Sequence, residues 1–262
     1  MGIVVRKCIY GLLSFVDRVL GYKEFPVAIF CYHSIASDDW RYGVEKKAFI
    51  EQMEYLLKHR QPITADDVLA HISGEKIITE PSFLLCFDDG YQDILSVREY
   101  LATCNIKPLL FVLSHPEEAD FTELGTKRAF LSVEETKSLA AEGWSIGSHG
   151  ATHGDFWQLS EEQQYKEVDF SKKILEQQLG ISVQYFAYPR GRYDQSILEK
   201  VAQSGYRLGF SMDDGRVDQE TNQFVIPRIG VDRTHSSREF QQLASPSNVA
   251  FRKIVKELLV KF

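Results

Sequence analysis

Short apolar runs alternate with helical patterns along most of this chain. Each run is five to seven residues long and mostly unbroken in its apolar character, which is typical of parallel strands covered on both faces. The pattern therefore predicts one α/β domain built on a parallel sheet, either an open doubly wound sheet or a barrel. The expected strands are residues 27–33, 83–87, 109–113, 144–148, 183–187, 206–211 and 224–229.

Helical periodicity and capping signals fill the intervals between these runs. Ser132 with Glu135 and Ser160 with Gln163 have the spacing of capping boxes, so each pair marks the start of a helix. Gly180 is a C-terminal cap for the second of these helices. The expected helices cover residues 46–59, 65–72, 91–103, 132–141, 160–180 and 194–204.

Both ends of the chain predict amphipathic helices, in segments 1–25 and 236–262, around a catalytic domain at 26–235. Packing of the apolar faces on the domain is the favoured interpretation, and peripheral contact with an anionic membrane is the alternative. The apolar face at the start comprises Val5, Ile9, Leu12, Leu13, Val16 and Leu20, opposite Arg6, Lys7, Asp17 and Arg18. The face at the end comprises Phe251, Ile254, Val255, Leu258, Leu259 and Phe262, opposite Arg252, Lys253, Lys256 and Lys261.

The first 20 residues also resemble a signal peptide weakly, because Arg6 and Lys7 precede the apolar run 8–16. The run is short and no small-residue cleavage site follows it, so a helix is favoured. The four cysteines lie far apart with no CxxC spacing, which is compatible with reduced thiols. We therefore expect a cytoplasmic protein, with membrane association or export left open.

Composition narrows the classes of partner. The chain has 262 residues, 44% of them hydrophobic, and a formal net charge of -7. Its size allows a large core, and we expect a single domain because no linker or repeat interrupts it. A nucleic-acid partner is not expected, since phosphate contacts need a dominant basic face.

Polar groups able to do chemistry follow several of the predicted strands. The first strand ends at His33, the second at Asp88 and Asp89, and the fourth at His149 with His153 close behind. Because the carboxyl ends of parallel strands meet at one edge, we expect these groups on one rim.

Asp88 and Asp89 repel each other at the end of an apolar strand, and a divalent cation would compensate their charge. The spacing of His149 and His153 lets both imidazoles share one ion, and a carboxylate with two imidazoles leaves positions open for water and substrate. Alone, Asp89-Gly90 could be a surface turn, and the histidines could be solvated loop residues. Together the two motifs favour a hydrolytic metal site.

Three segments resemble, in order and spacing, motifs of the polysaccharide deacetylases with a NodB-type catalytic domain, the carbohydrate esterase family 4 type. They are residues 87–90, 148–153 and 186–194. Residues 31–35 are similar to a segment of the branch that deacetylates exopolysaccharides such as poly-N-acetylglucosamine. The resemblance implies a distorted (β/α)7-type barrel in a single domain.

The resemblance also implies roles for individual residues. Asp89, His149 and His153 would bind one divalent ion, commonly Zn²⁺, and Asp88 would be the general base. A backbone N–H in the segment of Tyr188, Pro189, Arg190 and Gly191 would bind the oxyanion.

The chain departs from the family pattern at two places. The late Leu-x-His motif that usually supplies the general acid is missing, so His33 is the candidate acid, with His235 as the weaker alternative. Alanine occupies the position of the arginine that usually pairs with the base, so Arg190 or Arg228 would have to pair with Asp88. The sequence does not choose between them.

The expected activity is removal of an N-acetyl or other N-acyl group from an amino sugar in a polysaccharide or glycan precursor. One alternative is a deformylase or deacetylase of a lipid-linked saccharide at the membrane surface. Another is a carbohydrate-binding protein with a vestigial site; Asp88, Asp89, His149 and His153 oppose it, but the missing late motif leaves it open.

Overall fold

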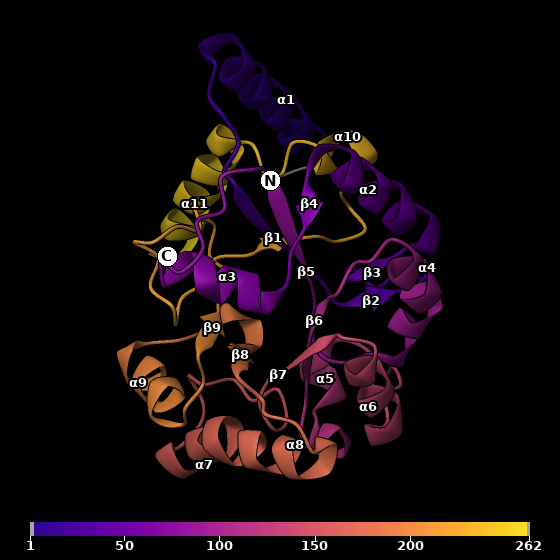
Figure 1. The fold of residues 1–262 in the computed structure, drawn as a ribbon, viewed down its shortest axis with the longest axis vertical. Helices are drawn as coiled ribbons and strands as arrows, with labels where there is room; N and C mark the ends of the chain where they lie inside the picture. The colour runs from indigo at the N-terminus through magenta and orange to yellow at the C-terminus, as the bar shows by residue number, and fades with distance from the viewer. Residues whose placement is uncertain (1–2, 261–262) are drawn as a thin grey trace.

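A curled parallel sheet forms the centre of the computed structural model, which describes residues 3–260 (Figure 1). The strand order is β10-β1-β5-β6-β7-β8-β9, with the short β4 paired to β5 outside this path, and each of these pairings is parallel. The strands are β1 (Val27–Tyr32), β4 (Gln61–Pro62), β5 (Ser82–Phe87), β6 (Leu109–Val112), β7 (Ser145–Ser148), β8 (Tyr185–Ala187), β9 (Leu208–Phe210) and β10 (Ile229–Gly230).

The segment 226–230 lies between the two edges of this sheet. Ile226 forms a parallel bridge with Phe210 of β9, and Ile229 pairs with Phe30 of β1. The segment therefore bridges the last strand and the first, which confirms the predicted distorted barrel. The seventh expected strand is much shorter than residues 224–229, because the chain pairs first with one edge and then with the other.

Side chains of the strands alternate between the barrel interior and the surrounding helices. Val27 and Ile29 belong to the interior cluster, whereas Ala28 and Phe30 belong to the cluster under the helices. Helix α3 (Ala65–Ile72) covers the amino end of the barrel with Ala65, which is fully buried in the interior cluster. Strands buried on both faces explain why the sequence shows apolar runs rather than alternation.

Helices surround the sheet largely as predicted. The capping boxes at Ser132 and Ser160 are both formed, and Gly180 ends its helix in the left-handed conformation. The segment after Gly90 begins as a 3-10 helix instead of an α-helix, and the loop 114–130 contains short helices that were not expected. The helices are α2 (Lys46–His59), η1 (Gln92–Val97), α4 (Arg98–Thr103), η2 (Pro116–Glu118), α5 (Phe121–Leu124), α6 (Val133–Ala141), α7 (Glu161–Tyr165), the π-helix (Lys166–Phe170), α8 (Ser171–Leu179), α9 (Gln195–Gln203) and α10 (Ser237–Phe240). The small sheet of β2 (Ser34–Ile35) and β3 (Gly43–Val44) was also missed.

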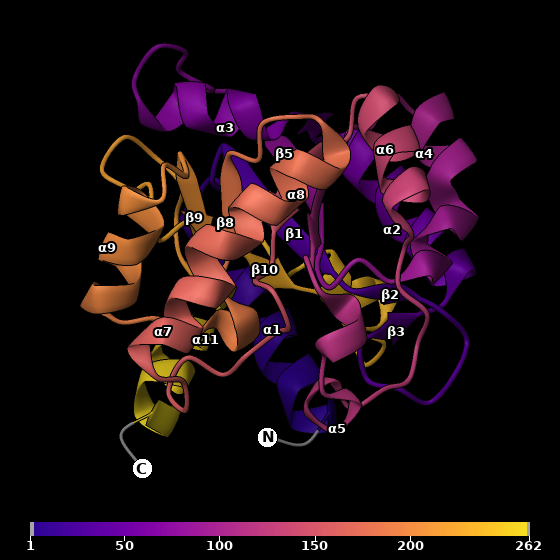
Figure 2. The ribbon, with the colours of Figure 1, turned by 90° about the horizontal axis from the view of Figure 1, so that it is seen from below.

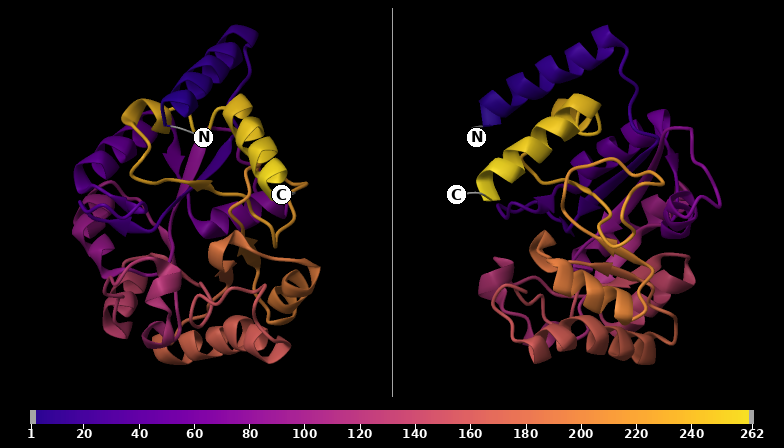
Figure 3. Two further views of the ribbon diagram at one scale, coloured as in Figure 1. Left: turned by 180° about the vertical axis from the view of Figure 1, so that it is seen from behind. Right: turned by 90° about the vertical axis from the view of Figure 1, so that its left-hand side faces the viewer.

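The terminal helices α1 (Ile3–Leu20) and α11 (Pro246–Val260) pack side by side on one flank of the barrel (Figure 3). The prediction that α1 buries its apolar face holds for only half of that face, because Ile9 packs against the core and Leu13 and Val16 are partly buried. Val5, Leu12 and Leu20 are exposed, because polar side chains of α1 contact the body instead. Ile254 and Leu258 of α11 are also exposed. Lys261, Phe262 and the side chain of Leu259 lie outside the described residues.

Among residues 3–260, no helix has the length and apolar character needed to cross a bilayer.

Candidate metal and catalytic site

Asp88 and Asp89 directly follow β5 and are almost completely buried. The Asp88 backbone N–H donates to the Tyr32 carbonyl oxygen over 2.9 Å, which extends the parallel pairing with β1 by one step. Asp89 then takes a φ of 68°, a left-handed conformation that is costly for a residue with a Cβ. The chain therefore turns at the strand end and directs the two carboxylates differently.

Arg228 pairs with both oxygens of Asp88. Its Nη1 and Nη2 atoms donate to Asp88 Oδ1 and Oδ2 over 2.6 and 2.8 Å, and its Nε donates to the Ser211 carbonyl oxygen over 3.0 Å. Burial opposes ionisation of Asp88, but the Arg228 guanidinium and its hydrogen bonds outweigh burial and hold the Asp88 pKa well below its usual range. Of the two arginines that the sequence left open, Arg228 in the bridging segment is therefore the partner of Asp88, whereas Arg190 is exposed.

Asp89 has no such partner on its Oδ1 atom. This atom is buried, accepts no hydrogen bond within the described chain, and lies 3.4 Å from His149 Nε2 and 3.7 Å from His153 Nε2. Burial, together with the negative charge of Asp88, raises the Asp89 pKa to about 6. The two neighbouring aspartates are therefore opposite in pKa shift.

His149 presents a free nitrogen toward Asp89. Its Nδ1 lies 2.9 Å from the Ala187 carbonyl oxygen, which can only accept, so Nδ1 carries the proton and Nε2 has a lone pair. Burial lowers the pKa of His149 to about 3, and it also lowers the pKa of His153. Both imidazoles are therefore neutral at neutral pH, as metal ligands must be.

Glu167 holds the loop that carries the two histidines. Its buried carboxylate accepts hydrogen bonds from the backbone N–H groups of Ala151 and Thr152 over 2.8 and 3.1 Å, and from Thr152 Oγ1 over 2.6 Å. At Gly150, where φ is 89°, a Cβ would approach Glu167 Oε2 to 2.3 Å, so only glycine fits there. Glu167 belongs to the π-helix, an element often found at functional sites.

Asp89, His149 and His153 fit a divalent ion. One ligand atom from each of them lies within 4.8 Å of the other two. The buried Asp89 Oδ1, with no hydrogen-bond partner in the described chain, fits the role of a cation ligand, since a buried carboxylate oxygen normally finds a donor or an ion. Two imidazoles and one carboxylate are a donor set used by catalytic zinc and by several other transition metals.

His33 follows β1 and stacks on Tyr42, with ring centroids 4.7 Å apart. Its Nδ1 is buried and has no hydrogen-bond partner in the described chain, and its charge, when present, lowers the pKa of Asp89. Tyr42 is partly exposed, and Trp40 packs edge-on against it. His33 therefore lies beside the metal-ligand group, next to an aromatic surface.

His235 lies in the loop before α10 and is engaged locally. Its Nδ1 accepts a hydrogen bond from the Asp232 backbone N–H over 3.1 Å. The Asp232 carboxylate in turn accepts hydrogen bonds from Arg41 Nε and Thr234 Oγ1. Burial lowers the pKa of His235 despite the neighbouring Asp232 carboxylate. These contacts give His235 a structural role in this loop.

The third motif forms a tight 3-10 turn over Pro189–Gly191 in which Arg190 has a φ of 59°. The expectation that Tyr188, Pro189 or Gly191 supplies an oxyanion donor needs correction. The Tyr188 N–H donates to the Phe210 carbonyl oxygen, the Gly191 N–H donates to the Tyr188 carbonyl oxygen, and proline has no N–H. In this motif the left-handed turn itself was not visible in the sequence.

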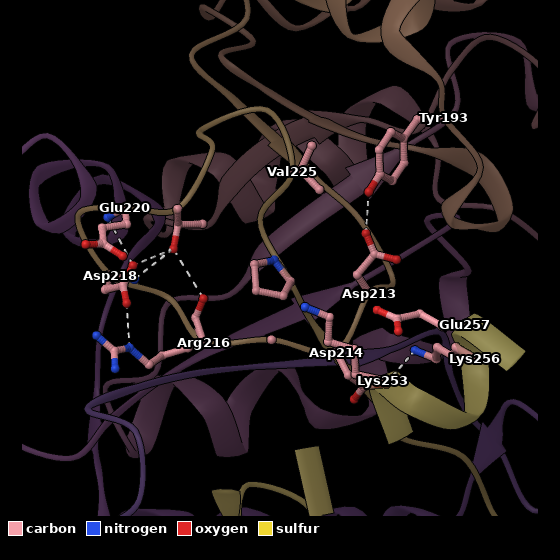
Figure 4. Close-up of a pocket in the computed structure, with 13 residues that line it drawn as sticks. Tyr193, Asp213, Asp214, Arg216, Asp218, Glu220, Val225, Lys253, Lys256 and Glu257 are labelled. Atoms are coloured by element: carbon pink, nitrogen blue, oxygen red, sulfur yellow. Dashed lines mark hydrogen bonds and ion pairs between the residues drawn. The ribbon is translucent and has the colours of Figure 1, made fainter. Parts of the chain in front are cut away.

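A separate surface pocket of about 540 Å³ lies between the loop after β9 and α11 (Figure 4). Asp214 is buried at the edge of this pocket. Its carboxylate forms ion pairs with Arg252 Nε at 2.6 Å and Lys256 Nζ at 2.7 Å, and these pairs anchor α11. No ligand atom of the Asp89, His149 and His153 group lines this pocket, which places it apart from the candidate metal site.

Comparison with known sequences connects these motifs to a family. The family model described as polysaccharide deacetylase matches residues 76–209. The chain is 27% identical over 220 residues to YxkH of Bacillus subtilis, to which a polysaccharide deacetylase activity is ascribed, and the match covers 83% of this chain and 76% of YxkH. It is 23% identical over 240 residues to the poly-β-1,6-N-acetyl-D-glucosamine N-deacetylase of Staphylococcus aureus, covering 81% of each chain.

Solved structures share the fold. The deacetylase PplD of Streptococcus pyogenes, solved with acetate, superposes with a TM-score of 0.71 at 23% identity, over 86% of this chain and 99% of PplD. IcaB of Ammonifex degensii superposes with a TM-score of 0.72 at 21% identity, over 86% of this chain and 98% of IcaB.

Proposed function

We propose that this chain, which belongs to the polysaccharide deacetylase family, is a metal-dependent hydrolase that removes N-acetyl groups from an amino-sugar glycan. The family predicted from the sequence motifs is confirmed by the match over residues 76–209. The observation that carries the proposal is the convergence of Asp89 Oδ1, His149 and His153 beside the paired Asp88.

Asp89 Oδ1, His149 Nε2 and a nitrogen of His153 would hold one divalent ion, with Zn²⁺ the first choice. When bound, such an ion supplies Lewis acidity that polarises an amide carbonyl and lowers the pKa of a water molecule towards ~7. The Ala187 carbonyl fixes the protonated nitrogen of His149, so the chain presents its ligand nitrogen without rearrangement.

Asp88 would receive the proton of the attacking water. The Arg228 guanidinium keeps Asp88 ionised and fixes its plane, while each carboxylate oxygen retains a second lone pair for a water molecule. Asp88 Oδ2 lies 3.9 Å from His149 Nε2, so this base faces the ligand group. The low pKa makes Asp88 a weak base, which suits a water molecule that is already acidified.

His33 would donate a proton to the departing amine. It lies at the end of β1 beside the ligand group, whereas His235 is bonded to Asp232 in another loop. By family resemblance, the oxyanion would be bound by the backbone N–H of the residue at the usual tyrosine position of the third motif, which is Arg190 in this chain.

An amino-sugar glycan is the substrate class supported by two observations. The S. aureus relative is named for poly-β-1,6-N-acetyl-D-glucosamine. The partly exposed Tyr42 ring beside His33 offers a flat apolar surface for the face of a sugar ring.

Metal content and acetate release test the proposal directly. Purified protein should hold about one divalent ion per chain and should release acetate from N-acetylglucosamine oligomers, and a chelator should abolish the release until Zn²⁺ is restored. Asp89→Ala and His149→Ala should lose both ion and activity. His59→Ala, which removes an exposed histidine of α2, is the matched control and should keep both. Full activity after complete metal removal would refute the proposal.

The role of His33 is tested through the leaving group. His33→Gln should lose about 10²–10⁴-fold of its activity on N-acetyl amides, because the amine must be protonated to leave. An activated aryl acetate needs no such proton, so its hydrolysis should change little. His235→Gln should leave the amide activity nearly intact; equal losses on both substrates would assign His33 a structural role.

A lipid-linked saccharide is the second candidate substrate, and one observation favours it. The exposed apolar residues of α1 would suit an enzyme that works at a membrane surface. Comparing turnover of free oligomers and of the same sugars on a lipid carrier in vesicles separates the two substrates. A vestigial carbohydrate-binding site would instead bind the oligomers without releasing acetate or formate.

A further inference from the structure

Helix α1 turns an apolar face to solvent. Phe15 is 60% exposed and Leu12 is 63% exposed, and their apolar neighbours along the same side are more than half exposed as well. We define the outward face of α1 as Val4, Val5, Leu12, Phe15, Val19 and Leu20. An exposed apolar stripe of this length usually marks an interaction surface.

Polar contacts hold α1 in this orientation. Arg6 Nε donates to Glu239 over 2.9 Å, and the Asp17 carboxylate accepts from the Ser247 backbone N–H over 3.1 Å and from its hydroxyl. Between them, Ser14 accepts from Asn248 Nδ2 over 2.9 Å. Arg6 and Asp17 are mostly buried. Rotating the helix to bury its apolar side would separate both charged groups from their partners. The apolar face is thus fixed outward.

Basic side chains border the outward face. Lys7, Arg18 and Lys23 are exposed and form no ion pair within residues 3–260. Residues 1–23 contain four basic residues and one acidic residue, although the whole chain has a net charge of -7. Positive charge is therefore concentrated where the apolar face lies.

We propose that the outward face of α1 docks on the surface of an anionic lipid bilayer. A helix with an apolar face, flanking Lys and Arg, and aromatic residues such as Phe15 and Tyr22 lies in the interface plane of such a membrane. A second copy of this chain fits less well, because a symmetric contact would bring patches of like charge together. The neighbouring helix α11 lies on the same flank of the molecule (Figure 3), and its residues Lys253 and Ile254 are exposed.

Docking would also orient the catalytic rim. Arg6 Nη1 donates to Thr234 Oγ1 over 3.0 Å, and this hydroxyl donates to the Asp232 carboxylate. The same carboxylate accepts a hydrogen bond from Arg41 Nε. Arg41 directly precedes Tyr42, whose ring stacks on His33. The amino-terminal half of α1 is thus connected to the rim by direct contacts. A bilayer bound by α1 would therefore be connected to the rim through this series of contacts. The docking itself does not depend on the proposed reaction.

Vesicle flotation of the full-length chain tests the proposal. Vesicles of phosphatidylcholine with about one third phosphatidylglycerol should bind the protein, and binding should weaken with added salt. Leu12→Asp/Phe15→Asp should reduce binding at least about tenfold, because charges would enter the apolar interface. Lys7→Glu/Arg18→Glu should weaken binding to the anionic vesicles and reduce its salt dependence.

Ile77→Asp is the matched control. Ile77 is 56% exposed and follows α3, which Figure 2 shows at the end of the molecule away from α1. The variant adds one negative charge to an apolar side chain of similar exposure and should bind vesicles like the unaltered chain. Circular dichroism should show unchanged folding in each variant, since the altered side chains face solvent.

Two outcomes would overturn the proposal. One is equal vesicle binding, or none, for the unaltered chain and Leu12→Asp/Phe15→Asp. The other is a dimer in sedimentation that this double variant dissolves, without binding to vesicles, which would assign the outward face to a second copy of the chain.

Discussion

Asp88 and Asp89 are neighbours in sequence, almost equally buried, and opposite in their surroundings. Both carboxylate oxygens of Asp88 accept hydrogen bonds from Arg228, and the Asp88 pKa lies well below the usual range. Asp89 leaves Oδ1 without a donor, and its pKa is raised to about 6. Burial raises the pKa of both, so the difference comes from the partner that one has and the other lacks.

The comparison teaches how one strand end can supply two functions. A buried carboxylate that is neutralised by a guanidinium needs nothing further from outside the chain. A buried carboxylate without a partner is destabilising until a cation arrives, so part of the ion-binding energy offsets that cost. The contrast between Asp88 and Asp89 separates a site for proton transfer from a site for metal.

Exchanging each aspartate for its amide should give the largest effects. Asp88→Asn should keep the metal but lower kcat about 10²–10⁴-fold, because it removes the group that accepts the proton. Asp89→Asn should lose the metal. Metal analysis and acetate release measured on the same preparations check both; equal metal loss in the two variants would erase the distinction.

Removing the partner of Asp88 should make it resemble Asp89. Arg228→Met should lower the free energy of unfolding by about 3–5 kcal/mol, because a buried charge is left unpaired. Asp88→Asn in the same chain should recover much of the loss. Urea denaturation measures each value.

The exposed pair of Arg216 and Asp218 supplies the control for this prediction. Arg216→Met should cost less than about 1 kcal/mol, as expected of a surface pair. A loss of that small size in Arg228→Met would mean that the Asp88 pair contributes no more than a surface contact.

Without metal, Asp89 should destabilise the protein in a pH-dependent way. Its pKa is about 6 in the folded chain and about 4 when unfolded, so the unfolded state loses its proton first as pH rises. Metal-free protein should therefore lose on the order of 2 kcal/mol of stability between about pH 4 and pH 6, and the loss should persist above that range.

Asp89→Asn has no such proton to lose, so metal-free Asp89→Asn should be more stable than the unaltered chain at pH 8 and similar at pH 4. Denaturation midpoints across this range, measured in chelator, check the difference. A variant that is no more stable at pH 8 would show that Asp89 is already compensated by the chain.

Weakening the support of the histidine loop should have the smallest effect. Glu167→Gln should reduce metal affinity about 10–100-fold, because one acceptor for the loop amides becomes a donor. Activity should return at saturating metal, as expected of a positioning residue. Glu176→Gln is the control, because Glu176 lies on the next helix and accepts from Val183 instead. Unchanged metal affinity in Glu167→Gln would remove Glu167 from the support of the site.

The sequence predicted the barrel and the convergence of Asp89, His149 and His153, because parallel strands buried on both faces leave a clear apolar pattern and place their ends on one rim. The arginine partner of Asp88 was not predictable, since it depends on how segment 226–230 bridges two strand edges. Glu167 gave no signal, because its hydrogen bonds to Ala151 and Thr152 arise only when the π-helix packs beside the loop that follows β7.

The orientation of α1 was predicted only in part, for a similar reason. Periodicity identifies an apolar face, but not which face meets the body. The contacts of Arg6 and Asp17 with residues 234–247 decide the orientation, and these residues are more than 200 positions away in the chain.

The bridging segment also sets when the site can exist during folding. Arg228 and Asp88 are 140 residues apart, and their pairing requires that segment 226–230 has already joined the first and last strands. Contacts between such distant residues generally form late, after the local loops and helices. A partly folded barrel would hold two uncompensated aspartates, so the charge balance of the active site is completed only by the final closure of the fold.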